Sequence, residues 1–168
     1  MDDLKEMYAS LNLKNVRTYI QSGNVIFDDD NNDKISLIKM IEDKIINVLG
    51  LDVSVILRDH SQLETVLNGN PFLKNDTKDP PHLYVTFLSG VPYHSHIEKL
   101  NEINHAPDAF RIIGSEIYVF CPEGYGKTKL NNSFFENKLK LQATSRNWRT
   151  INELNRMMVS ESRSIPVP

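Results

Sequence analysis

The sequence predicts an α+β fold of two tandem ferredoxin-like (split βαβ) plaits with antiparallel sheets, in which the first plait lacks its opening strand. Two observations support this prediction. The expected elements follow the order α-β-β-α-β in the first half and β-α-β-β-α in the second, with a short last strand near residues 143–145. A polar stretch with two prolines, residues 75–81, separates the halves. The expected domains are residues 1–74 and 82–159, followed by a flexible tail at residues 160–168.

In the first half, the apolar residues predict a helix, a hairpin and a long second helix. Residues 3–11 carry apolar side chains at helical spacing. The hairpin that follows reverses at Gly23 and Asn24, because both residue types tolerate a positive φ. Apolar residues then recur on one face of a helix over residues 34–49, which Gly50 ends.

The remaining strands are expected where short apolar runs are bounded by turn residues. They cover residues 53–57, 82–88, 109–113 and 116–120. Two further helices are expected near Pro92 and over residues 127–139, the latter rich in lysine. The element order of the second half is therefore that of a nearly complete plait.

Two residue pairs have the spacing of a capping box, in which a polar side chain and an acidic one three residues later satisfy backbone N–H groups. Ser61 with Glu64 predicts the start of a short helix that ends before Pro71. Thr150 with Glu153 predicts the start of the last helix.

Composition limits the class of protein. The chain has 168 residues, of which 40% are apolar and 24% are charged, the usual range for a globular protein. The single cysteine, Cys121, excludes an internal disulfide, and no apolar run approaches the roughly 20 residues that span a bilayer. No signal-like leader opens the sequence, so we expect a cytoplasmic protein that does not bind membranes.

Neither a cofactor nor a metal ion is expected. The acidic run at residues 28–33 lacks the spacing of a calcium-binding EF-hand. His94 and His96 fall at an expected helix start, where residues two apart diverge. The glycine-rich residues 124–128 resemble a phosphate loop, but Cys121 stands where a nucleotide-binding P-loop needs glycine. A structural turn and an anion-binding loop are both open interpretations of this stretch.

Charge is distributed unevenly along the chain. Residues 124–150 contain six basic residues and one acidic residue, a net charge of +5. The rest of the chain contains 13 basic and 21 acidic residues, a net charge of -8. Such a basic segment favours an anionic ligand or a nucleic acid as partner, although a solvated helix face is the alternative explanation.

The candidate binding residues lie in this basic segment and at the hairpin tip. They are Lys127, Lys129, Arg146, Asn147, Trp148, Arg149, Gln21, Ser22 and Asn24. Arginines that flank an indole can stack a base and pair with phosphates. Packing of the lone tryptophan beneath the last helix is the alternative. The polar hairpin tip either hydrogen-bonds a ligand or only forms the turn.

Four segments together resemble a bacterial family. They are VRTYIQSGNVIF at residues 16–27, NPF at residues 70–72, GYGKTKL from residue 124 with Asn132 after it, and ATSRNWRT from residue 143. In this order they resemble the family known as domain of unknown function 1697. The resemblance implies a two-plait α+β architecture and no particular activity. Members of that family open with a strand carrying an Arg-Gly-Ile-Asn-Val-Gly-Gly stretch, so its absence here implies that the first plait lacks its opening strand.

Three classes of function are compatible with these observations. The leading hypothesis is a non-enzymatic binding module whose basic C-terminal region takes an anionic ligand or nucleic acid. The second is a small-molecule enzyme with a pocket between the two halves. The third is a protein-interaction module, in which the incomplete sheet accepts a strand from a second copy and forms a homodimer.

Overall fold

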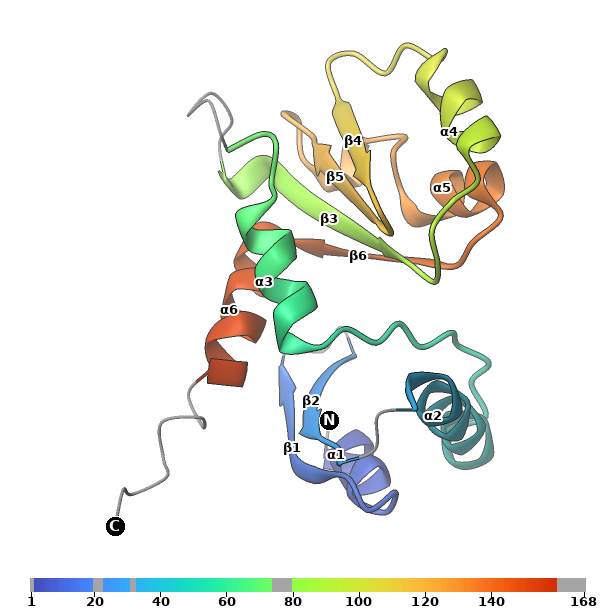
Figure 1. Ribbon diagram of the computed structural model, residues 1–168, viewed down its shortest axis with the longest axis vertical. Helices are drawn as coiled ribbons and strands as arrows, with labels where there is room; N and C mark the ends of the chain where they lie inside the picture. Colours follow the sequence, from blue (N-terminus) through green and yellow to red (C-terminus); the bar gives the residue numbers. More distant parts are fainter. Residues whose placement is uncertain (1, 20–22, 31–32, 74–79, 160–168) are drawn as a thin grey trace. The chain divides into compact units, whose positions relative to one another are not determined.

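The computed structural model describes residues 2–19, 23–30, 33–73 and 80–159 (Figure 1). Within these residues the protein has an α+β structure with six α-helices and two antiparallel sheets, one of two strands and one of four. The chain divides into two compact units. Unit 1 comprises Met1–Leu57 and Arg156–Pro168, and unit 2 comprises Arg58–Asn155.

Unit 1 contains a helix, a hairpin and a long second helix. These elements are α1 (Asp2–Ala9), β1 (Lys14–Tyr19), β2 (Asn24–Asp28) and α2 (Lys34–Leu49). In the hairpin, Tyr19 lies opposite Asn24 and Arg17 lies opposite Ile26. The predicted hairpin and the predicted bounds of the long helix are confirmed.

Local interactions set the two ends of α2, and an apolar core holds it in place. The Asp33 carboxylate accepts hydrogen bonds from the backbone N–H groups of Ile35 (3.2 Å) and Ser36 (3.1 Å). Gly50, with φ of 67°, ends the helix in the left-handed conformation. The buried core side chains of unit 1 are Met7, Tyr8, Leu13, Val16, Leu37, Ile41 and Ile45.

The strand predicted at residues 53–57 is wrong. The structure gives residues 51–59 no regular secondary structure. The backbone N–H of Val55 donates to Glu42 Oε1 of α2 at 2.8 Å instead of to a neighbouring strand. A β-prone segment becomes a strand only when a second strand supplies backbone partners, and here a helix side chain takes that role. The described part of unit 1 therefore contains a sheet of two strands.

Unit 2 is built around a four-stranded antiparallel sheet with the order β4-β5-β3-β6. Its elements are α3 (His60–Asn68), the 3-10 helix η1 (Pro80–His82), β3 (Leu83–Leu88), α4 (His94–Asn101), β4 (Ala109–Ile113), β5 (Glu116–Phe120), the 3-10 helix η2 (Tyr125–Lys127), α5 (Asn132–Leu139), β6 (Ala143–Asn147) and the part of α6 (Trp148–Val159) that ends at Asn155. From β3 to β6 the connectivity is β-α-β-β-α-β, which is that of a split βαβ unit. The short strand expected near residues 143–145 is present as β6.

The core of unit 2 lies between its sheet and helices α4 and α5, which Figure 1 shows together on one side of the strands. The strands contribute alternate residues to this core, because successive side chains of a strand point to opposite faces of a sheet. The buried side chains of this core are Leu88, Leu100, Phe110, Ile117, Val119, Cys121, Leu130, Phe135 and Leu139.

Helix α3, which the sequence places in the first domain, belongs to the second compact unit. The hydroxyl of Tyr118 in β5 donates to the Val66 carbonyl of α3 at 3.2 Å. Arg58, directly before α3, donates from Nε to Glu116 Oε1 at 2.9 Å. Its Nη2 donates to the Leu88 carbonyl at 2.9 Å, and its guanidinium lies 5.6 Å from the Phe87 ring centre. These contacts join α3 to the face of the sheet opposite α4 and α5.

Three helices begin at residues other than those predicted. Helix α3 begins at His60 with a capping box of Asp59 and Gln62, so the expected Ser61 and Glu64 pair is wrong. Helix α5 begins at Asn132, and the lysine-bearing stretch before it is partly 3-10 helix. Helix α6 begins at Trp148 instead of Thr150. Directly before the observed first residue of each helix, an aspartate or asparagine side chain accepts a backbone N–H. These caps explain why the helices begin at residues other than those predicted.

The ion pair between Arg58 and Glu116 provides a test of the fold. The two side chains are 15% and 16% exposed, so loss of the cation alone leaves a largely buried carboxylate without its partner. We expect Arg58→Met to lower the free energy of unfolding by about 3 kcal/mol. The double variant Arg58→Met/Glu116→Leu should lose clearly less. Denaturant unfolding followed by the fluorescence of Trp148, the lone tryptophan, measures both values.

The control for this prediction is Glu98→Gln, which removes an exposed pair with His94 in the same unit. Its denaturation midpoint should match that of the unchanged protein. A single Arg58→Met variant as stable as the unchanged protein would contradict the assignment of Arg58 as the link between α3 and the sheet.

Candidate functional site

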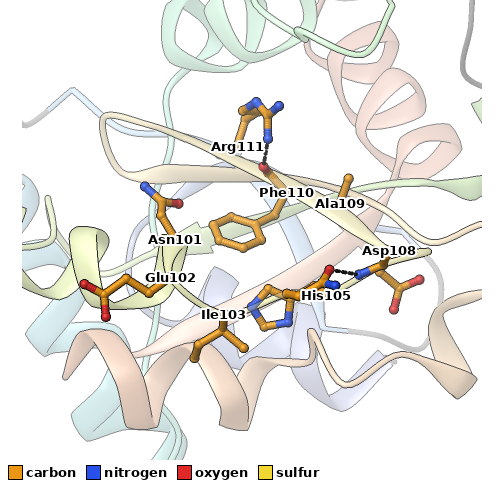
Figure 2. Close-up of a pocket in the computed structure, with 10 residues that line it drawn as sticks. Asn101, Glu102, Ile103, His105, Asp108, Ala109, Phe110 and Arg111 are labelled. Carbon is orange, nitrogen blue, oxygen red and sulfur yellow. Dashed lines mark hydrogen bonds between the residues drawn. The ribbon is translucent and has the colours of Figure 1, made fainter.

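Two adjoining hollows lie where the chain enters β4. The large hollow, about 410 Å³, is lined by residues 101–106 and 108–111 (Figure 2). The small hollow, about 230 Å³, is lined by residues 104–108, Glu123 and residues 127–130. Because residues 104–106 and Asp108 line both, the two hollows adjoin on unit 2, and together they are called the depression.

The loop between α4 and β4 shapes the wall between the two hollows. The Asn104 side chain accepts a hydrogen bond from the Ala106 N–H at 3.0 Å, which closes a turn. The His105 ring packs edge-on against the rings of Phe110 and Phe134, with centres 5.5 and 5.3 Å away. Its Nε2 atom is buried and has no hydrogen-bond partner among the described residues. These contacts hold the imidazole in one orientation above the sheet.

The loop between β5 and α5 supplies the cations of the small hollow. Gly124 has φ of 91°, a conformation that a side chain would strain, so glycine is needed there. Tyr125 anchors the loop, because its hydroxyl donates to Ser145 Oγ at 2.7 Å and its ring lies 4.7 Å from that of Tyr84. Lys127 and Lys129, on this loop, are both exposed.

A single threonine joins the two loops. The Thr128 hydroxyl donates to Asp108 Oδ2 at 2.5 Å and accepts the Leu130 N–H at 3.0 Å. The Asp108 carboxylate therefore has a hydrogen-bonded partner inside the protein. No ion pair involves Lys127 or Lys129 within the part of the chain that the structure describes, so the small hollow offers two unpaired ammonium groups.

Cys121 lies beneath this junction and is fully buried. Burial raises the pKa of its thiol to about 11, and the charge of Asp108 acts in the same direction, whereas a hydrogen bond with Thr128 opposes them. The thiol is consequently protonated near neutral pH. Because the thiolate is the nucleophilic form, Cys121 is unsuited to nucleophilic chemistry here.

Comparison with known proteins identifies the family. The family model described as "Protein of unknown function (DUF1697)" matches residues 1–118, which is more than half of the chain. The chain belongs to this family. The matched residues include His105 and Asp108 but end before the loop that carries Lys127 and Lys129.

A solved structure supports the fold of this DUF1697 protein. The conserved bacterial protein SP0830 from Streptococcus pneumoniae is 21% identical, with a TM-score of 0.72 over 94% of this chain and 88% of that one. At this identity the likeness concerns the fold alone. The search of curated proteins found no match. Among the described residues of the DUF1697 chain, no helix is long and apolar enough to cross a bilayer, and no cluster of acidic, histidine and cysteine residues could hold a metal ion.

The basic residues that the sequence of the DUF1697 protein predicts as binding residues do not all lie at one site in the structure. Lys127 and Lys129 line the small hollow. Arg146 points to the other face of the sheet, because its neighbour Ser145 contacts Tyr125 and side chains alternate along a strand. Its Nη1 donates to Thr144 Oγ1 at 2.7 Å, and burial lowers the pKa of its guanidinium.

The residues after Arg146 have structural contacts of their own. The Asn147 side chain accepts the Thr150 N–H at 2.7 Å and so caps α6. Trp148 is 9% exposed, which favours its packing interpretation over base stacking. Arg149 is exposed in the first turn of α6. Only the two lysines among these predicted residues line the depression.

Of the three candidate residues at the hairpin tip, the structure describes one, Asn24. Gln21 and Ser22 lie outside the described residues. Asn24 is 7% exposed, and its Nδ2 donates to the Tyr19 carbonyl across the turn at 3.1 Å. The turn-forming interpretation therefore accounts for Asn24.

Sequence reasoning missed His105 and Asp108, which form the wall of the site. Both lie in a short polar connection between an expected helix and an expected strand, and no periodic pattern includes them. The available signal was the polar, proline-containing stretch directly before a buried strand, because loops before core strands often carry functional side chains. Their partner Thr128 is 20 residues away in sequence from Asp108.

The chemical environment of Cys121 is directly testable. In the folded protein we expect its thiol to resist iodoacetamide at about pH 8, with labelling that accelerates only as the pH approaches about 11, the raised thiol pKa. Asp108→Asn should lower that pKa, because it removes a negative charge that opposes thiolate formation. Intact-mass spectrometry counts the label. Protein in denaturant is the control and should react fully, and rapid labelling of the folded protein at about pH 8 would refute this description.

Proposed function

We propose that this protein is a non-enzymatic binding module that takes a small anionic ligand at Lys127 and Lys129. One observation carries the proposal: two unpaired ammonium groups line a hollow whose wall, His105 and Asp108, is fixed by internal contacts. Two cations beside a concave surface favour an anion, because their combined field raises its local concentration there.

The arrangement supports a small ligand better than a nucleic acid. An extended strand would need aromatic rings and cations along one exposed surface. Trp148 is buried, and Arg146 lies on the sheet face opposite Ser145 and Tyr125. Arg149, the exposed basic residue that follows Trp148, does not line the depression. The candidate cations are therefore concentrated at one concave spot.

The arrangement also supports binding better than nucleophilic catalysis. The thiol of Cys121 is buried and its pKa is raised to about 11. The Asp108 carboxylate is engaged by Thr128. The depression lies wholly within unit 2, so the proposal does not use a pocket between the two halves of the chain.

The tandem-plait architecture is part of the proposal. The β-α-β-β-α-β connectivity and strand order of unit 2 support a complete split βαβ plait there. In unit 1, a hairpin flanked by helices α1 and α2 supports an incomplete plait. We place the binding function in the complete plait.

Inorganic pyrophosphate is a suitable probe for the proposed anion site. Titration followed by backbone amide chemical shifts should perturb residues 104–108 and 124–130, against a sodium chloride reference of equal ionic strength. Lys127→Ala/Lys129→Ala should weaken binding about 5- to 30-fold, because each exposed ion contact contributes up to about 1 kcal/mol. Glu123→Gln should strengthen binding about 1.5- to 5-fold, since it removes an unpaired carboxylate from the same hollow.

The matched control is Lys99→Ala/Lys138→Ala, which removes two exposed lysines of unit 2 that do not line either hollow. Its affinity for pyrophosphate should equal that of the unchanged protein. Equal losses in the two double variants would mean that net charge alone attracts the anion. Absence of any shift in the depression would overturn the proposed function.

Self-association through unit 1 is a second candidate function. The observation in its favour is that β1 and β2, among the described residues, pair only with each other, so each strand has an edge that a second copy can use. Such pairing predicts a mass that doubles with concentration. Multi-angle light scattering over a hundredfold range, about 1 to 100 μM, measures it, and a constant monomer mass would eliminate this candidate.

A further inference from the structure

We propose that the ligand is a phosphomonoester of a hydroxyl-bearing molecule, such as a sugar phosphate or a nucleotide. Its phosphate occupies the small hollow and its uncharged part occupies the large one. This inference rests on the proposed anion site at Lys127 and Lys129 and extends it to the neighbouring depression.

Volume is the first argument. Small-molecule sites in proteins usually enclose about 300 to 1,000 Å³. The small hollow, at about 230 Å³, falls below this range and suits one charged group, whereas the large hollow, at about 410 Å³, falls within it. Residues 104–106 and Asp108 line both hollows, so a ligand that passes over this shared border reaches the two of them. An inorganic anion would leave the large hollow empty.

The distribution of charge is the second argument. The end of the depression at Lys127 and Lys129 carries two unpaired cations, and it also contains the carboxylates of Glu123 and Asp108. The large hollow is lined by Asn101, by Arg111 and by Glu102, whose side chain has no hydrogen bond or ion pair among the described residues. A carboxylate accepts hydrogen bonds, so Glu102 favours hydroxyl or amino groups. The lysines thus favour the phosphate at one end, and Glu102 favours a hydrogen-bond donor at the other.

The position of Glu102 strengthens this argument. Glu102 directly follows the last residue of α4, and its backbone N–H donates to the Glu98 carbonyl at 3.3 Å. The C-terminus of a helix carries a partial negative charge, so an acidic side chain there reduces helix stability. Helix stability thus gives no reason for a glutamate at this position. Contact with a hydrogen-bond donor of a ligand gives such a reason.

Apolar surface between the two ends accommodates the carbon skeleton. Figure 2 shows the Phe110 ring between Asn101 and His105, with Ile103 below them. Phe110 is 8% exposed, so its ring contributes a floor, and Ile103 is 39% exposed. Arg111 is held back from the floor, since its Nη1 donates to the Phe110 carbonyl at 2.7 Å. A molecule with hydroxyl groups on a compact carbon frame matches this mixture of surfaces.

The test compares four probes on the same protein: inorganic phosphate, ribose, ribose 5-phosphate and adenosine 5′-monophosphate. Dissociation constants come from the amide shifts of residues 101–111 and 124–130. We expect ribose 5-phosphate to bind about tenfold more tightly than phosphate, because Glu102 gains a charge-assisted hydrogen bond from a hydroxyl. Ribose alone should bind most weakly. Tighter binding of the nucleotide than of the sugar phosphate would show that a base also fits.

Two variants separate the two ends of the depression. Glu102→Ala should reduce the preference for ribose 5-phosphate over phosphate to about twofold or less while leaving phosphate binding intact. Lys127→Ala/Lys129→Ala should weaken both phosphorylated probes alike. Glu98→Ala, in the helix that precedes Glu102 but outside the depression, is the control and should change the affinity for neither probe.

The outcomes distinguish this inference from the proposed function. If phosphate binds through the two lysines and the ester binds no more tightly, the phosphomonoester inference is wrong and the anion site stands. The same conclusion follows if the preference for the ester survives Glu102→Ala. If none of the phosphorylated probes perturbs the depression, both proposals are overturned.

Discussion

The hydroxyl of Thr128 is the contact on which the candidate site depends. It donates to Asp108 and accepts the N–H of Leu130, so one side chain ties the loop before β4 to the loop after β5. Each loop alone is a surface connection whose conformation its neighbours only partly determine. Joined, they place the lysines of one loop beside the histidine of the other, and they cover Cys121.

A partly buried hydrogen-bond network extends this constraint into the sheet. Ser145 in β6 contacts Thr86 in β3 at 2.6 Å, donates to Asn132 at the start of α5 at 2.6 Å, and accepts the Tyr125 hydroxyl at 2.7 Å. Every member is satisfied, which is the condition under which a polar cluster rigidifies a core. These hydrogen bonds therefore fix the lysine-bearing loop relative to β3, β6 and α5. Burial raises the pKa of Tyr125, so this donor keeps its proton near neutral pH.

The features predicted correctly from the sequence are mainly those that depend on residues close together in the chain. The helix over residues 34–49 has its cap, its periodicity and its terminal glycine within one stretch of chain. The segment 53–57 has the residue types of a strand, but pairing is a tertiary property, and Glu42 supplies its contact instead. Composition is enough to propose Lys127 and Lys129 as binding residues, whereas the wall formed by His105 and Asp108 depends on the meeting of two loops that are distant in sequence. Asn147 and Trp148 look like binding residues in sequence because caps and ligand contacts use the same side-chain types.

Unit 1 is discontinuous in the chain, and this has a consequence for biosynthesis. Met1–Leu57 and Arg156–Pro168 belong to it, and the whole of unit 2 lies between them in the sequence. Arg17 in β1 donates to the carbonyl of Met157, 140 residues later, so this contact forms only after unit 2 has been synthesised. The residues between, Arg58–Asn155, are contiguous and can fold as they emerge, because domains generally fold as units during synthesis. Until Met157 has been synthesised, the guanidinium of Arg17 therefore lacks this backbone acceptor.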